Sequence, residues 1–232
     1  MDAFRKVFAM MVALFLCNSM IAQEETKSIS FQIRGGMNIS NLSASDDHYW
    51  VTADPKVGYN VGAAVDFPIG KGMYIHSGLS LTSKGAKVDD IRFDLDGGGY
   101  TSTDMKMNAV YLQVPLYFAY KLDFSRWNSS WDNKLGLSAG PFIGYGVFGK
   151  TKVESGFSSS GNIDGSFDTF GDWDLWNRTE VGLGFEASFE LKKIVFYLGT
   201  EVSLTNVWKK KHLNNDAHVA NTNVYLGVGY SF

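Results

Sequence analysis

Apolar and polar residues alternate with a period of two in eight separate segments of the chain. The segment 221–232 shows this well, with Val224, Leu226 and Val228 alternating with Asn223, Tyr225 and Gly227. Because successive side chains of a strand point to opposite faces, the segment predicts a strand with one apolar and one small, mostly polar face. The other predicted strands are 29–39, 56–67, 73–84, 106–122, 134–148, 177–190 and 194–204.

The connections between these strands alternate in length. Those at 68–72 and 192–193 are tight and the one at 123–133 is intermediate, whereas 40–55, 85–105, 149–176 and 205–221 are long. Short turns at one rim and long loops at the other are typical of outer-membrane barrels, with the long loops extracellular. We therefore predict an all-β fold: an eight-stranded antiparallel up-and-down transmembrane β-barrel with its apolar face towards lipid. A soluble periplasmic barrel that binds an apolar ligand is the alternative.

Two prolines, Pro115 and Pro141, lie inside predicted strands. Proline has no N–H to donate to a ladder, so we expect a β-bulge at each position.

Aromatic residues gather near both ends of the predicted strands, as expected of belts at the two membrane surfaces. Those near the short turns are Phe67, Phe124, Trp127, Trp131, Tyr230 and Phe232, and those near the long loops are Tyr49, Trp50, Phe148, Trp173, Trp176 and Trp208.

Residues 1–22 have the features of a secretory signal peptide. Arg5 and Lys6 precede an unbroken apolar run at 7–16, and a cleavage site follows between Ala22 and Gln23. We expect one mature domain, 23–232, which contains no cysteine and therefore no disulfide, since Cys17 leaves with the signal. Its predicted location is the outer membrane of a Gram-negative bacterium.

The net charge of −3 does not suggest nucleic-acid binding, which requires a basic face. At the other end of the chain, Tyr230 and Phe232 lie on the apolar face of the last predicted strand. We expect them to form the signal that the barrel assembly machinery reads.

Four short motifs resemble those of a known family. They are GGMNIS at 35–40, SKGAK at 83–87, YLQVPL at 111–116 and GPFIGY at 140–145. Together they are similar to the PorT-like outer-membrane β-barrel proteins of Bacteroidetes, and the similarity spans the predicted mature chain. The resemblance implies the barrel fold and the outer-membrane location, and implies that both prolines belong in their strands. The family is defined by its barrel and not by a chemistry, although one member serves a protein secretion system.

If the apolar face meets lipid, the charged residues of the other face enter the lumen. These are Arg34, Asp66, Lys121, Arg178, Glu180, Glu186, Glu190 and Glu201. The interior of an eight-stranded barrel is just wide enough for side chains to fill, and charges buried there must be paired. We predict a packed polar plug in which Arg34 and Arg178 meet the glutamates of 177–190 and 194–204. A narrow outer-membrane channel is the alternative.

No catalytic or metal site is expected. His76 and Ser77 point to opposite faces, and His48, His212 and His218 lie in predicted loops without a triad. The DLDG motif at 94–97 resembles the start of a calcium loop but lacks the later glutamate, and no cofactor motif is present. We expect a structural or interaction role, with three partners: outer-membrane lipid, the assembly machinery and an unidentified protein at the extracellular loops.

Overall fold

The computed structural model describes residues 28–46, 49–95, 99–124, 133–157, 161–171, 176–208 and 218–232. The predicted signal peptide lies outside these ranges. The described strands are β1 (Ser30–Asp46), β2 (Tyr49–Thr52), β3 (Asp54–Pro68), β4 (Met73–Leu95), β5 (Gly99–Asp123), β6 (Asn133–Phe157), β7 (Gly161–Asp168), β8 (Thr179–Leu191), β9 (Ile194–Ser203) and β10 (His218–Ser231). No helix within these ranges has the length and apolarity needed to cross a membrane.

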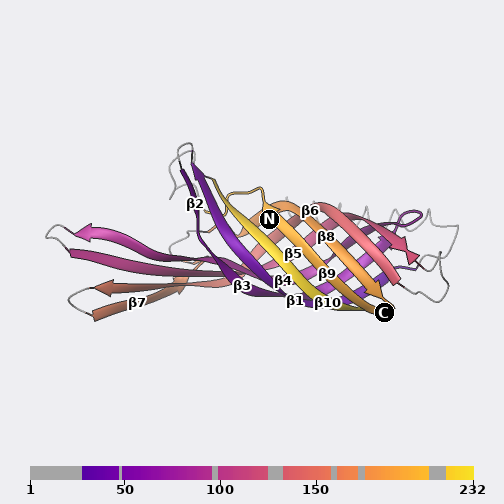
Figure 1. The fold of residues 1–232 in the computed structure, drawn as a ribbon, viewed down its shortest axis with the longest axis horizontal. Helices are drawn as coiled ribbons and strands as arrows, with labels where there is room; N and C mark the ends of the chain where they lie inside the picture. The colour runs from indigo at the N-terminus through magenta and orange to yellow at the C-terminus, as the bar shows by residue number, and fades with distance from the viewer. Residues whose placement is uncertain are drawn as a thin grey trace.

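Eight of the strands form a closed antiparallel barrel, as predicted (Figure 1). They follow the order β10-β9-β8-β6-β5-β4-β3-β1, and β1 pairs again with β10 to close the wall. The closing register runs from Gln32 opposite Ser231 to Ser45 opposite His218. Closure removes the sheet edges, so the strands of the wall can pair every ladder group without water.

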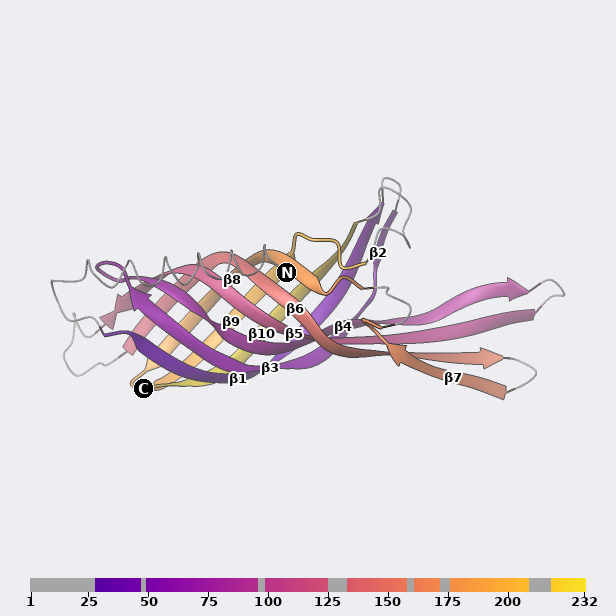
Figure 2. The ribbon, with the colours of Figure 1, turned by 180° about the vertical axis from the view of Figure 1, so that it is seen from behind.

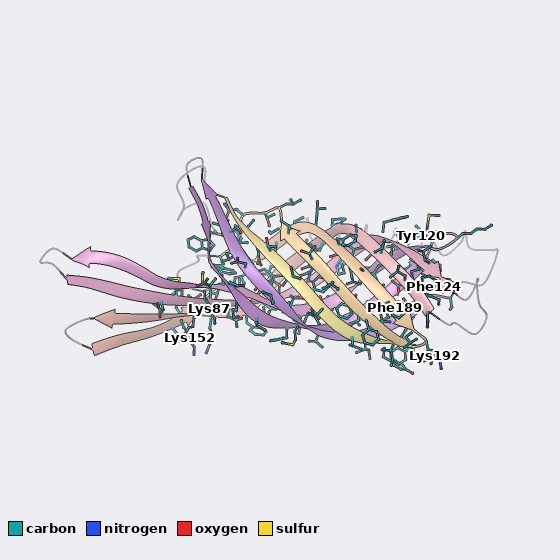
Figure 3. All side chains as sticks on the ribbon, viewed as in Figure 1. Lys87, Tyr120, Phe124, Lys152, Phe189 and Lys192 are labelled. Carbon is teal, nitrogen blue, oxygen red and sulfur yellow. The ribbon has the colours of Figure 1, made fainter. Side chains whose placement is uncertain are left out.

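The apolar face of each barrel strand points outward, which confirms the predicted orientation. Leu116 is 50% exposed and Leu226 60% exposed, whereas Asn38 and Glu186 on the opposite face are 1% and 4% exposed. Figure 3 shows this coat of side chains around the barrel. An exterior that is apolar around a polar interior is the arrangement of a barrel whose solvent is lipid.

The predicted loops at 85–105 and 149–176 contain regular strands. β4 and β5 continue as a hairpin, β5 stays paired with β6 up to Thr101 opposite Phe157, and β7 pairs with the end of β6. Residues 87–95, 99–106, 150–157 and 161–168 thus form a four-stranded sheet, here called the outer sheet, which projects from one end of the barrel (Figures 1 and 2). Sequence alternation did not reveal these strands because the segments are polar and glycine-rich.

The expected bulges at Pro115 and Pro141 are absent. Pro115 pairs with Phe142 and Pro141 with Leu183, and the register does not shift at either residue. In an antiparallel ladder only alternate residues bond to a given neighbour, so a proline removes a single bond. At Pro115 the free carbonyl accepts a hydrogen bond of 2.8 Å from Ser77 Oγ. The shifts that do occur lie elsewhere, at Pro55/Asn60, Val88/Ile91 and Val110/Tyr111.

Candidate functional site: the polar lumen and its outer closure

The lumen near the short turns is occupied by an ion-pair cluster centred on Asp66 of β3. Lys121 Nζ lies 2.7 Å from Asp66 Oδ2 and also contacts Glu190 Oε1, while His76 Nδ1 lies 2.6 Å from Asp66 Oδ1. Gln32 donates a further hydrogen bond of 2.9 Å to Asp66 Oδ2. Both carboxylate oxygens of Asp66 are therefore satisfied, as a buried charge requires.

Arg34 joins this cluster to the middle of the lumen. Its Nη2 lies 2.7 Å from Glu186 Oε1, its Nη1 lies 3.1 Å from His76 Nε2, and its guanidinium stacks 3.7 Å from the centre of the Tyr197 ring. Because an arginine can only donate, His76 Nε2 is the acceptor of this contact, which leaves Nδ1 to donate to Asp66. Tyr225 donates to the second oxygen of Glu186 at 3.1 Å.

A second ion-pair group lies nearer the outer sheet and is centred on Lys84. Its Nζ is 3.2 Å from both oxygens of Glu180 and 3.4 Å from Glu201 Oε2. Glu201 also accepts hydrogen bonds from Gln113 and Asn223. Lys84 was not among the predicted luminal charges. Its place in the alternating series with His76 and Thr82 was the signal that could have identified it.

Tyrosine side chains fill the lumen between these groups, and glycines on other strands make room for them. A Cβ at Gly184 would lie 1.9 Å from the hydroxyl oxygen of Tyr117, and one at Gly227 would lie 2.3 Å from that of Tyr197. The small polar face noted in the sequence is therefore the surface against which the luminal rings pack.

Two small cavities lie between the luminal side chains just described. One cavity of about 60 Å³ borders Arg34, Gln113, Glu186 and Glu201, and another of about 10 Å³ borders Asp66 and Lys121. Such volumes hold a few water molecules at most. Among the described residues there is no group of three or more His, Cys, Asp or Glu side chains arranged to hold a metal ion.

An apolar cluster, here called the outer cap, covers the end of the lumen that faces the outer sheet. Its buried members are Leu42, Ala86, Met107, Ala109, Tyr111, Phe170, Trp176, Val207 and Val219. Phe170 stands edge-on to Tyr111 at 5.8 Å and to Trp176 at 6.4 Å between ring centres. Asn177 donates a hydrogen bond of 2.8 Å to the carbonyl of Asn206, which ties together the two segments that fold over the lumen.

Two predicted roles at this end are corrected by the structure. Arg178 is exposed and donates hydrogen bonds of 3.1 Å to the carbonyls of Gly146 and Phe170, so it lies at the rim of the cap and not against a glutamate. It precedes the first residue of β8, and the strand alternation does not extend to it. Trp176 is 1% exposed inside the cap, and therefore does not belong to a membrane-surface belt.

The other belt residues divide into three groups. Phe67, Phe124 and Trp208 are half-buried, and Trp208 packs against the outer cap. Phe148, Tyr230 and Phe232 are 56%, 46% and 69% exposed, as a lipid-facing position requires, and Tyr230 lies edge-on to Phe232. The side chains of Tyr49, Trp50, Trp127, Trp131 and Trp173 lie outside the described residues.

A closed wall, an apolar exterior and an ion-paired interior define a β-barrel membrane protein. The sequence model of the outer membrane protein beta-barrel domain family matches residues 21–209, so the chain belongs to that family and resides in the outer membrane. No curated protein matches the chain at the level of sequence.

Several solved outer-membrane proteins have a similar chain course. A major outer membrane protein from Thermus thermophilus is 13% identical with a TM-score of 0.44, over 88% of this chain and 100% of that one. Neisserial surface protein A (NspA) is 13% identical with a TM-score of 0.37, and the match covers 90% of this chain and 100% of that one. The attachment invasion locus protein Ail of Yersinia pestis, solved with a heparin analogue, is 14% identical with a TM-score of 0.34. The match covers 87% of this chain and 99% of that one.

Proposed function

We propose that the protein is a non-conducting outer-membrane anchor that presents the outer sheet to a protein partner outside the cell. The observation that carries this proposal is the double obstruction of the lumen. Ion pairs and tyrosines fill its length, and the outer cap covers the end nearer the outer sheet.

A channel would need these contacts to open. Arg34, Lys84 and Lys121 each bind carboxylates from other strands, and a conducting path would require some of these buried ion pairs to separate, at a cost in free energy. Opening the cap would in addition expose the buried rings of Phe170 and Trp176. These energies favour a plug over the predicted alternative of a narrow channel.

The outer sheet is suited to recognition because its outer strands have open edges. Among the described strand pairings, β7 pairs only with β6, and β4 beyond Lys87 pairs only with β5. Such edges accept an added strand from a partner. The sheet is held away from the barrel, where a partner can reach it (Figure 2).

More specific assignments rest on sequence motifs. The GGMNIS, YLQVPL and GPFIGY motifs support membership of the PorT-like group of Bacteroidetes.

We further propose that the exposed Tyr230 and Phe232 are read by the barrel assembly machinery, and that the protein is not an enzyme. In support of the last point, both nitrogens of His76 are engaged, and Ser77 Oγ donates to a backbone carbonyl.

Two measurements test the anchor role. In planar bilayers the purified protein should show no stepwise conductance, and reproducible steps would refute the closed lumen. Replacing the β4–β5 hairpin beyond Val88 and Met105, and the β6–β7 hairpin beyond Val153 and Gly165, with two-residue turns should leave the barrel folded, as judged by heat-modifiable gel migration. If the shortened protein failed to fold, the outer sheet would be part of the barrel's structure and not a separate display element.

A further inference from the structure

Three lysines form a row across adjacent strands at the base of the outer sheet. Lys87 of β4 lies directly opposite Lys106 of β5, which lies directly opposite Lys152 of β6. Directly opposed side chains on one face are close neighbours, and like charges there are destabilising. The register therefore concentrates positive charge at one level of the outer sheet.

Two further lysines extend this row towards the barrel. Lys150 is on the same face of β6 as Lys152, and both side chains are exposed. The ammonium of Lys56 contacts Oδ1 of Asn108, the residue directly opposite Lys150. Lys56, Lys87, Lys106, Lys150 and Lys152 are here called the lysine collar. Figure 3 shows Lys87 and Lys152 where the outer sheet leaves the barrel.

The collar starts where the apolar exterior ends. On β6 the exposed Val147 and Phe148, 43% and 56% accessible, are followed by Lys150. On β3 the exposed Val57 immediately follows Lys56. The first lysines therefore lie at the level where hydrocarbon gives way to lipid headgroups.

Acidic residues also occur in this region, and their order along the strands is informative. They include Asp54 opposite Lys87, Asp168 opposite Lys150, the row of positions formed by Asp104, Glu154 and Asp164, and Asp89 and Asp90, which follow Lys87 in β4. That acidic row comes two residues beyond the basic row on the side away from the barrel. Ion pairs within the sheet would form equally well if the acidic row were nearer the barrel and the basic row farther from it. The observed order, with the basic row nearer the membrane, is the one that an anionic headgroup layer favours.

We propose that the lysine collar binds the phosphate groups of anionic lipid in the outer leaflet, along the β3–β6 side of the barrel. Lysine ammonium groups bind phosphate as compact point charges, and each one near an anionic surface contributes roughly fivefold in affinity. This inference requires only that the barrel lies in the outer membrane, and is independent of the anchor role.

Native mass spectrometry of the detergent-purified protein tests the collar. The probes are lipid A carrying both phosphates and the same lipid after dephosphorylation. The phosphorylated lipid should bind at least roughly tenfold tighter, and the K87Q/K106Q/K152Q variant should lose most of that difference. Equal binding of the two lipids by the unaltered protein, or unchanged selectivity in the variant, would overturn the proposal.

Three controls keep the result interpretable. K71Q/K192Q/K193Q removes the same charge from exposed lysines at the short turns and should bind as the unaltered protein does. K87R/K106R/K152R keeps the charge and should retain the selectivity. Heat-modifiable migration reports whether each variant is folded. A sulfated oligosaccharide that binds at the collar while phosphorylated lipid A does not would assign the collar to a soluble polyanion, against the proposal.

Discussion

Arg34 of β1 and Glu186 of β8 meet in the lumen, with Nη2 2.7 Å from Oε1. Their strands are not neighbours in the sheet, since β1 pairs with β2, β3 and β10, and β8 pairs with β6 and β9. Only the closure of the barrel brings the two charges together. This ion pair can therefore form only when the barrel is closed.

Replacing Glu186 by leucine should destabilise the barrel by about 3–5 kcal/mol, because Arg34 would remain buried without its counter-ion. The double variant R34L/E186L should recover much of that loss. Urea unfolding in lipid vesicles, followed by tryptophan fluorescence, gives the four free energies of a double-mutant cycle. Additive effects of the two substitutions would show that the side chains do not interact.

Leu116→Arg should cost about 2–4 kcal/mol in a bilayer if the position is near the midplane, because the side chain points into hydrocarbon. Leu116 is 50% exposed on the outer face of β5. The apolar replacement Leu116→Phe at the same site should change the stability little. Normal folding of the arginine variant in lipid would be incompatible with an outward-facing Leu116.

Gly184→Ala should destabilise the barrel by about 1–3 kcal/mol, since the added methyl group would overlap the buried hydroxyl of Tyr117. Gly35→Ala is the matched control, because a Cβ there has no atom within 4 Å. Removing the hydroxyl with Tyr117→Phe should restore part of the loss at Gly184. If both alanine variants unfolded at the same denaturant concentration, the overlap with Tyr117 would not limit the side chain at position 184.

Trp176→Ala should cost about 3–5 kcal/mol, because the ring is buried against Phe170 in the outer cap. Phe148→Ala removes an aromatic ring of the exposed face and should cost less, since that side chain is 56% exposed. Thermal unfolding in detergent compares the two variants. An equal loss in both would show that the cap contributes no packing of its own.

The strands of the barrel could be predicted because their two faces meet different environments. Leu112 and Leu116 face outward while Gln113 and Tyr117 are buried, as the alternation predicts, so β5 was recognisable within its barrel segment. The luminal positions of Arg34 and Glu186 follow from the same alternation. Arg178 does not, because it lies outside β8 and its hydrogen bonds depend on a loop that folds over the rim.

Other features depend on contacts between distant parts of the chain. Phe170, Trp176 and Val207 come from segments predicted to be loops, and their burial in the outer cap has no local pattern. Lys84 meets Glu180 and Glu201 because β4, β8 and β9 surround one lumen. The opposition of Lys87, Lys106 and Lys152 depends on strand register, which a bulge of one residue would change.

The sequence by itself determined the number of barrel strands, the face that each turns to lipid and most of the charges that the wall encloses, because side-chain alternation is a local property of the backbone. Tertiary structure alone decided which charges pair, how the lumen is capped and that the long connections form an outer sheet. Those outcomes depend on the closure and register of strands far apart in the chain, and local alternation carries no information about either.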